Sequence, residues 1–468
     1  MASPARQGIF PFIVKGFGCE DVTANAGLPL VLETAHALHV EESVEAHLHI
    51  AKRQRGFTEY EKLEALILLT AAGGERVEDI RILSDDKALL RLIDRPSLPS
   101  PDALLELLRA FDDPKAREAQ PADELSFVPE ESAPLQALHL INRDLVRRIV
   151  ELRQPKVATI DHDGTLIESH KSDAKMAYEG TRGFQPLVAL WAEEDLVVAD
   201  EFRDANVPGG KDPLSSVKKA FEALPASVVE RFFRADSAAY YQPLLKWLVQ
   251  ESIGFCISAD MTKELKQACL GLPVEAWSRM EERVKELVDL AEVEFTPGAW
   301  PKDAPPLRYV AIRFTPRQVD ALTEAQPRHH AVVTNRPVEA ITGEALITWH
   351  REKAGSIEHC HRVMKDELAA GVLPSIKFGA NAAWFRINAI TYNLLTALKR
   401  LALPERFHSS RPKRLRFEVF GIPGRVSLHQ SQLGVTLAAS DERVQEIVRA
   451  RQALLAARDR PQAVNSVH

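Results

Sequence analysis

Cysteines are scarce in this sequence, and long apolar runs are missing from it. Its 468 residues include four cysteines, none of them in a CxxC pair, so neither a disulfide framework nor a zinc module is indicated. No stretch comes near the roughly 18 consecutive apolar residues of a membrane span, and no basic segment followed by an apolar run opens the chain. We therefore expect a protein of a reducing, cytoplasmic compartment that is neither secreted nor inserted into a membrane.

The chain also lacks a net positive charge. The formal net charge of -7 at pH 7 argues against nucleic acid as a partner, because binding to phosphates depends on lysine and arginine. The basic residues are unevenly spread, however, since residues 377–416 hold nine lysines and arginines against one acid, Glu405. This segment could form a local phosphate-binding face or only a solvated helix surface, and charge alone leaves both interpretations open.

The length of the chain predicts several domains, because one hydrophobic core rarely organises more than about 300 residues. Helical patterns dominate the first part. The apolar window at Thr58–Ala72 is stopped by Gly73, and Ser100 followed by Pro101 has the pattern of an N-cap with proline in the first turn. These helices could bind DNA or could serve packing and dimerisation.

Strand and helix signals alternate from residue 155 onward, which predicts a mixed α/β sheet. The expected strands cover residues 157–160, 186–191, 196–202, 228–233 and 254–258, and the expected helices cover 212–224, 337–368 and 379–403. Between residues 270 and 333 we expect strands at 292–296, 309–314 and 330–334 together with an amphipathic helix. Residues 112–134 have the composition of a linker, and after residue 412 the weak signals predict a frayed tail.

Two expected strands end in acidic residues. Asp161 and Asp163 follow the apolar run that starts at Val157, and because they are two apart on an extended chain their side chains leave from the same face. Asp236 follows the expected strand 228–233. Paired acids at a strand end can hold a metal ion, although an aspartate before glycine, as at Gly164, is also ordinary turn chemistry.

A third group of charges lies on the long helix expected after Pro337. Glu358 and Lys365 are seven residues apart, which is two helical turns, so they share a face that Arg351 would also join. Charges at this spacing are usually a surface ladder. His359, Cys360 and His361 are neighbours in sequence but point in different directions on a helix, so no zinc site is expected there.

The order of these acids resembles the DDE-type transposases of bacterial insertion sequences, in the branch that has a β-rich insertion between the second acid and the glutamate. Coverage runs from about residue 156 to 404. Six segments carry the resemblance in the family's order: TIDHDGTLIESHK, EGTRGFQPL, EFRDANVP, FRADSAAY, REKAGSIEHCHRVMKDEL and FGANAAWFRINAITYNLL.

The resemblance implies a mixed α/β fold with a ribonuclease H-like catalytic core that is interrupted by a β-rich insertion and preceded by a helical N-terminal domain. The implied divisions are a helical domain for DNA-end binding and a linker at 1–150, the first part of the core at 151–268, the insertion at 269–336, the second part of the core at 337–410 and a C-terminal region at 411–468.

The resemblance also implies the chemistry. Asp163, Asp236 and Glu358 would hold two Mg²⁺ or Mn²⁺ ions for metal-dependent cleavage at the element's ends and strand transfer into target DNA. Asp161 shares the face of Asp163 and is the alternative first acid; Asp163 is preferred because it precedes a small residue and a threonine. Lys365 would grip a phosphate of the transposon end.

The family's glutamate helix carries a tyrosine, an arginine, the glutamate and a lysine at fixed spacing, and this sequence departs from that pattern. Arg351 and Ala354 stand at the tyrosine and arginine places, so Arg351 and Lys353 become candidate DNA contacts, together with Asn381 and Arg386 on the following helix. The implied partners are double-stranded DNA, as terminal inverted repeats and target, and a second copy of the chain in a synaptic complex. The implied location is the bacterial cytoplasm, at the nucleoid.

Two alternatives remain open at this point. The letters DHDGTL match the opening motif of haloacid dehalogenase-like phosphatases, in which Asp161 would be the nucleophile and Asp163 the acid or base. That family needs a second acidic pair downstream, where this chain has only Asp236. A catalytically silent derivative that only binds DNA is the other alternative, and the presence of all three acids argues against it.

Overall fold

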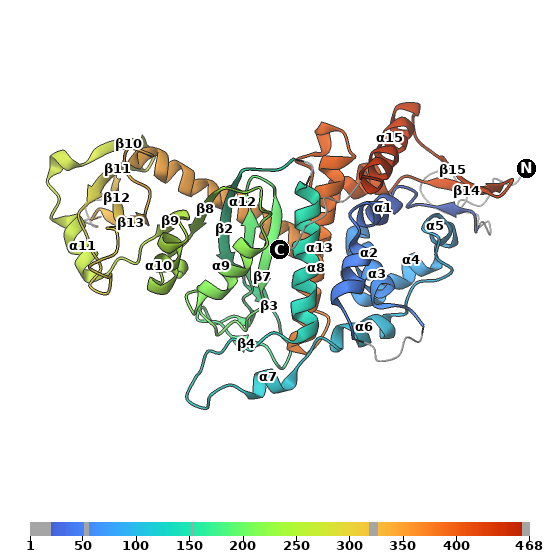
Figure 1. Ribbon diagram of the computed structural model, residues 1–468, viewed down its shortest axis with the longest axis horizontal. Coiled ribbons are helices and arrows are strands. Elements are labelled where there is room, and N and C mark those ends of the chain that lie inside the picture. Colours follow the sequence, from blue (N-terminus) through green and yellow to red (C-terminus); the bar gives the residue numbers. More distant parts are fainter. Residues whose placement is uncertain (1–19, 51–55, 152, 318–325, 461–468) are drawn as a thin grey trace, which may run out of the picture.

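A computed structural model describes residues 20–50, 56–151, 153–317 and 326–460 of the chain. The molecule is elongated, with the N-terminal helices at one end, a twisted sheet in the middle and a β-rich region at the other end (Figure 1). Within the described ranges no helix has the length and apolar character needed to cross a membrane. The cysteines Cys256, Cys269 and Cys360 are free and buried, whereas Cys19 lies outside the described residues.

A nine-stranded sheet organises the molecule, and β2 (Val157–Gly164) lies inside it. On one side β2 pairs antiparallel with β6 (Leu187–Trp191), which pairs antiparallel with β7 (Leu196–Glu201). On the other side β2 pairs parallel with β8 (Glu230–Ala235), which pairs parallel with β9 (Gly254–Ser258). Three antiparallel strands followed by two parallel ones, in the order β7-β6-β2-β8-β9, form the expected ribonuclease H-like core. The predicted mixed α/β fold is confirmed.

Four antiparallel strands extend this sheet beyond β9. They are β13 (Arg328–Thr334), β12 (Arg308–Pro316), β11 (Glu286–Val293) and β10 (Ser278–Glu282), in that order. The expected amphipathic helix is wrong in the described part of this region, because β10 and β11 occupy residues 278–282 and 286–293 and the helix α11 (Lys263–Leu270) ends before them. The expected strand 292–296 overlaps only the last two residues of β11. Apolar residues of the strands, such as Val288 and Val310, pack together with Leu346 of α12.

Two helices cover opposite faces of the core around β2. The α9 helix (Pro213–Glu222) packs against β6 and β7, and the α12 helix (Gly343–Glu367) packs against β2 and β8. The start of α12 was predicted at Pro337, but the Thr342 side chain accepts a hydrogen bond from the backbone amide of Ala345 and begins the helix there. The α10 helix (Gln242–Gln250) packs against α9 and β9.

The edge strand β7 is covered by two long helices, α8 (Ala133–Val150) and α13 (Phe378–Leu401), which pack against each other. The Asn142 side chain donates to the Val197 carbonyl at 2.9 Å, and the Val197 amide donates to the Asn393 side chain at 2.8 Å. These contacts satisfy backbone groups that an edge strand would otherwise expose. The α13 helix is buried along nearly its whole length because α3 and α6 cover its other side.

The N-terminal part is helical, as predicted. The α3 helix begins at a capping box in which Thr58 and Glu61 exchange hydrogen bonds, and it ends at Gly73, whose φ of 97° favours glycine. The helices of this part are α1 (Pro29–Ala37), α2 (Val40–His47), α3 (Glu59–Ala72), α4 (Ile80–Asp85), α5 (Lys87–Leu92), α6 (Pro101–Arg109) and α7 (Pro114–Glu118).

The C-terminal region is folded, so the expected frayed tail is wrong up to residue 460. The helix α15 (Asp441–Arg458) packs on α1 with Leu454 buried, and Arg451 pairs with Glu33 at 2.7 Å. The remaining short elements are α14 (Pro412–Leu415), a π-helical turn (Arg416–Phe420), the sheet formed by β1 (Val22–Thr23), β14 (Gly424–His429) and β15 (Gln432–Leu437), and the sheet formed by β3 (Ile167–Glu168), β4 (Lys175–Met176) and β5 (Arg182–Phe184). The predicted division of the chain into five segments stays a prediction.

Candidate active site

Successive side chains of β2 point to opposite faces of the sheet, so its two acids, which are two residues apart, point to the same face. Asp161 and Asp163 both contact side chains of α12, whereas His162, between them, lies 3.1 Å from the hydroxyl of Ser216 on α9. The neighbouring strand β8 repeats the spacing with Arg234 and Asp236. Since the parallel register pairs Asp161 with Arg234 and His162 with Ala235, one further step brings Asp163 beside Asp236 on adjacent strands, whose backbones are about 5 Å apart.

Asp161 is fully buried and its carboxylate is occupied by protein donors. Arg234 donates from Nε to Oδ1 at 2.6 Å and from Nη2 to Oδ2 at 3.0 Å, and the Ser356 hydroxyl of α12 also donates to Oδ2. Arg234 is itself almost fully buried, stacks on the ring of Trp349 and pairs with Glu352 at 3.0 Å. This bidentate, charge-balanced arrangement occupies both carboxylate oxygens of Asp161 with protein donors.

Asp163 lies at the open end of the same strand, with 20% of its side chain exposed. The Lys353 ammonium of α12 donates to Oδ2 at 2.8 Å, and the amide of Gly164 donates to Oδ1 at 2.8 Å. Asp163 therefore has a single lysine as counter-ion, where Asp161 has a bidentate arginine and a hydroxyl. Of the two acids in the DHD sequence, Asp163 is the one that remains accessible.

Asp236 is the first residue after β8 and accepts a hydrogen bond from the amide of Ala238 at 3.1 Å. The residue is exposed at the strand end, yet the protein around its carboxylate excludes enough water to raise its pKa, and the negative charge of Asp163 raises the pKa further. The charge of Lys353 opposes both effects. Asp163 and Asp236 thus form a pair of like charges that repel each other at one edge of the sheet.

Glu358 lies on α12, one residue after the buried Ile357, and is exposed. Across the described ranges no three histidine, cysteine, aspartate or glutamate side chains are close enough together to hold a metal ion. The structure therefore brings Asp163 and Asp236 together but does not add Glu358 to them as a preassembled metal site. Its predicted role as the third acid stays a prediction.

Comparison with known proteins identifies the family. The family model "Transposase DDE domain group 1" matches residues 12–458, nearly the whole chain. The chain belongs to the DDE transposase family. Among solved structures it is similar to a piggyBac transposase synaptic complex with hairpin DNA, with 12% sequence identity, coverage of 85% of this chain and 80% of that chain, and a TM-score of 0.45. No curated protein sequence matches it.

Family membership makes this protein an enzyme that cleaves DNA and transfers strands, as predicted. DDE transposases generally use divalent metal ions. The phosphatase alternative is not favoured, because its nucleophile would be Asp161, whose carboxylate is buried between Arg234 and Ser356.

The candidate DNA contacts of the transposase fall into two groups. Lys353, Lys365 and Arg351 lie on α12, where Lys365 donates to the Leu166 carbonyl at 3.4 Å and Arg351 pairs with Glu281 of β10 at 3.1 Å. The other group, Asn381 and Arg386, is buried on α13, and its predicted DNA contact stays a prediction.

Asn381 and Arg386 are buried and bonded inside the protein. The Asn381 side chain joins the amide and carbonyl of Ser375, each at 3.0 Å, and Arg386 pairs with Asp200 at 2.8 Å and with Glu131 at 2.6 Å. Side chains whose polar groups are satisfied in the core cannot reach a DNA backbone without unfolding α13 from its neighbours.

The basic segment 377–416 is likewise mostly paired within the transposase. Lys399 pairs with Asp195 at 3.7 Å and Arg400 with Glu194 at 2.7 Å. The further pairs are Arg406 with Glu446, Arg411 with Glu367 and Arg414 with Glu418. These ion pairs occupy the charges of the five side chains within the protein, and a phosphate-binding role for the segment stays a prediction.

Sequence reasoning missed Arg234 and Ser356, and it considered His361 only as a zinc ligand. The signal for Arg234 was present, because FRAD repeats the two-residue spacing of DHD on a strand predicted to lie nearby. Ser356 and His361 gave no signal on their own. Burial lowers the pKa of His361 to about 4 against the charge of Asp163, and its Nε2 atom is buried without a hydrogen-bond partner among the described residues.

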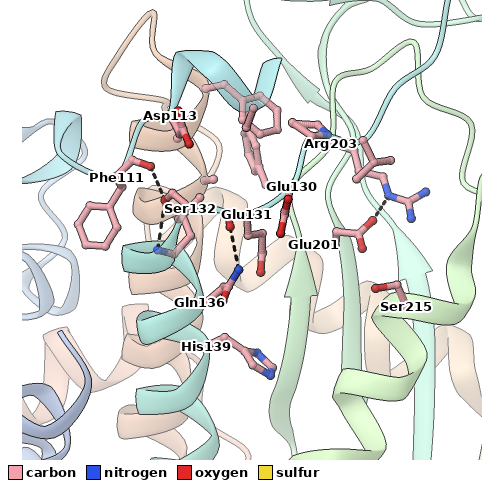
Figure 2. A pocket seen from close by; sticks show the side chains of 18 of the residues that line it. Phe111, Asp113, Glu130, Glu131, Ser132, Gln136, His139, Glu201, Arg203 and Ser215 are labelled. Atoms are coloured by element: carbon pink, nitrogen blue, oxygen red, sulfur yellow. Dashed lines mark hydrogen bonds and ion pairs between the residues drawn. The ribbon is translucent and has the colours of Figure 1, made fainter. Parts of the chain in front are cut away.

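A cavity of about 500 Å³ lies away from these acids, between the segment 111–132, α8, β7 and α9 (Figure 2). Its wall includes the Glu201–Arg203 ion pair and Ser132, which caps α8. None of the predicted catalytic acids lines it. The candidate active site of the transposase is instead the open edge of the sheet where β2 and β8 end.

Proposed function

We propose that Asp163, Asp236 and Glu358 are the catalytic acids with which this transposase cleaves the ends of its element and joins them to target DNA. The observation that carries the proposal is the register of β2 and β8, which puts Asp163 and Asp236 side by side at the open edge of a ribonuclease H-like sheet. Glu358 is assigned from the family's motif and from its position on α12, the helix that covers this face.

The residues at this edge fit divalent metal ions. Magnesium prefers carboxylate oxygens, and Asp163 and Asp236 supply them in a pair whose mutual repulsion a cation would relieve. Glu358 would complete the set from α12. Bound there, two Mg²⁺ or Mn²⁺ ions would supply activation of the attacking oxygen and stabilisation of the leaving oxygen during in-line displacement at phosphorus.

The protein's own groups hold this edge in place. Arg234 of β8 donates hydrogen bonds to Asp161 of β2 and to the Trp349 carbonyl of α12, so one side chain links the two strands and the helix. Lys353 keeps a positive charge beside Asp163, and Lys365, further along α12, would bind a phosphate of the transposon end. Ordered strand ends with charged groups already in position lower the cost of organising a charged transition state.

The partners that follow are double-stranded DNA, as terminal inverted repeats and as target, and a second copy of the chain within a synaptic complex. The helices at 1–150 and the linker would bind the ends, and the segments 151–268, 269–336, 337–410 and 411–468 would be the two core parts, the insertion and the C-terminal region. Action on a bacterial chromosome would place the protein at the nucleoid in the cytoplasm.

An excision assay on a plasmid that carries the native ends tests the proposal. Asp163→Asn, Asp236→Asn and Glu358→Gln should each lose detectable cleavage while they retain folding and end binding. Asp366→Asn, which removes an exposed acid from the same helix, is the matched control and should cleave normally. Full activity in any of the first three variants would remove that residue from the site.

A phosphatase assay and an end-binding assay on the same proteins separate the rival functions. Release of phosphate from a small phosphoester by the parent protein, lost in the Asp163→Asn variant, would favour the phosphatase. End binding without cleavage in the parent protein, at any divalent ion concentration, would favour a silent DNA-binding derivative.

A further inference from the structure

The side chain of Lys353 is buried, which is rare for a lysine. The residue is only 9% exposed, and its ammonium is 2.8 Å from Oδ2 of Asp163. Its charge also acts on Asp236, the other acid at the strand ends. Burying an ammonium is costly unless an opposite charge compensates it, so Lys353 and the two aspartates depend on one another for charge balance.

The contrast with the neighbouring pair on the same strands is informative. Asp161 and Arg234 are 0% and 3% exposed and are joined by two hydrogen bonds with the planar guanidinium. The side chains of Asp163 and Lys353 are 20% and 11% exposed and are joined by one hydrogen bond. An ammonium on a flexible stem forms a point contact that can be exchanged, whereas a bidentate guanidinium is pre-organised to stay. The Asp161–Arg234 pair is therefore held more firmly than the Asp163–Lys353 pair, whose single hydrogen bond can be exchanged.

The charges at this site indicate when the Lys353–Asp163 ion pair would separate. A single lysine leaves the pair Asp163 and Asp236 with one uncompensated negative charge, and Glu358 would add another. A divalent ion that used the oxygens of Asp163 would meet a positive charge at hydrogen-bond distance from one of them. The two cations would repel each other at this distance, and this repulsion favours release of the lysine from Oδ2 as the metal ion arrives.

We propose that Lys353 is a positioning residue that occupies Oδ2 of Asp163 in the metal-free transposase, is displaced from it by the incoming divalent ion, and then contacts a phosphate of the DNA strand being cleaved. The proposal rests on the proposed function, since it takes Asp163 and Asp236 as metal ligands. It assigns to Lys353 the cation that the family's pattern would carry at position 354, where this chain has Ala354.

The test compares metal binding by the full-length protein without DNA. Mn²⁺ affinity is measured by electron paramagnetic resonance for the parent, Lys353→Met and Lys353→Arg. The parent must break the Lys353–Asp163 ion pair before the ion binds, so Lys353→Met should bind Mn²⁺ more tightly than the parent, by roughly tenfold, whereas Lys353→Arg should bind it no more tightly than the parent does. Lys353→Gln, which retains a hydrogen-bond donor, gives the same comparison if the methionine variant does not fold.

A second readout separates this role from a purely structural one. The melting temperature of Lys353→Met should fall without metal, because the two aspartates lose their counter-ion, and millimolar Mg²⁺ should restore it. Lys219→Met removes a lysine–carboxylate pair of 2.9 Å with Glu131 elsewhere in the fold and should melt lower with or without Mg²⁺.

The outcomes are distinguishable. Parent-like Mn²⁺ affinity in Lys353→Met, with a melting temperature that Mg²⁺ does not restore, would make Lys353 a structural ion pair only and overturn the inference. If the parent binds Mn²⁺ no better than Asp163→Asn does, the proposed metal site itself fails. Cleavage that drops in Lys353→Met despite tighter metal binding, and recovers in Lys353→Arg, would support the contact with phosphate.

Discussion

Replacing Asp161 by asparagine should separate the structural acid of the DHD sequence from the catalytic one. The change keeps the shape of the side chain and removes its charge. Arg234, which is 3% exposed, would then lose its bidentate carboxylate and keep only Glu352, whose side chain is 62% exposed, and the Trp349 carbonyl. A buried guanidinium without a buried counter-ion is the main cost of the substitution.

The magnitude follows from the burial of the pair. Removing one partner of a buried ion pair costs about 3–5 kcal/mol, and the remaining contacts of Arg234 place Asp161→Asn near the lower value, about 3 kcal/mol. For a cooperative unit of roughly 200 residues the unfolding entropy is about 0.4 kcal/mol per kelvin, so the melting temperature should fall by about 7 °C. Asp163→Asn should lower it by less, because Asp236 still compensates the buried charge of Lys353 and the repulsion between the two aspartates is relieved.

The assay measures melting by circular dichroism and plasmid excision for both variants side by side. We expect Asp161→Asn to melt lower and to retain cleavage at a temperature where it is folded, and Asp163→Asn to melt higher than Asp161→Asn and to lose cleavage. The reasoning would be refuted by the reverse pattern, in which Asp161→Asn melts like the parent and cannot cleave.

Three further predictions concern stability. Arg386→Met should lower the free energy of unfolding by about 3–5 kcal/mol in urea titrations, because it leaves Asp200 buried without its partner. Burial lowers the pKa of His162 to about 3 in the folded protein, so below its unfolded pKa of about 6.5 only the unfolded chain gains a proton. Between pH 7 and pH 5 this residue should therefore lower the free energy of unfolding by about 2 kcal/mol. The free energy of unfolding of His162→Gln should depend less on pH over this range. Leu454→Asp should release α15 from α1 and expose residues 441–458 to limited proteolysis, since it puts a charge at a site that is 2% exposed.

One result would contradict each of these three predictions. Unchanged urea stability in Arg386→Met would mean that the Asp200 contact is not formed. An identical pH dependence in His162→Gln and the parent would mean that His162 titrates near its ordinary pKa in the folded protein. Parent-like resistance of α15 to proteolysis in Leu454→Asp would mean that the helix is held by other contacts.

Local signals predicted most of the core. The strand at 254–258 and the helix at 212–224 appear at or within two residues of the predicted bounds, because caps, prolines and apolar periodicity act within a few residues. The same kind of signal failed between residues 270 and 317, where the expected amphipathic helix is absent and β10 and β11 form because β12 offers a partner strand. The ion pairs of the basic segment 377–416 could not be predicted locally, because most of their partners, such as Asp195 and Glu194, come from other parts of the chain.

The sequence by itself determined that Asp161 and Asp163 share a face, that Asp236 ends another strand, and that Glu358 lies two turns from Lys365 on a helix. These are consequences of backbone periodicity, which every residue carries locally. Only the tertiary structure decided what each acid contacts, because these contacts depend on how distant segments pack. The parallel register between β2 and β8 brings together residues 73 apart in sequence, so that Asp161 pairs with Arg234, while Asp163 lies beside Asp236 at the open edge and pairs with Lys353.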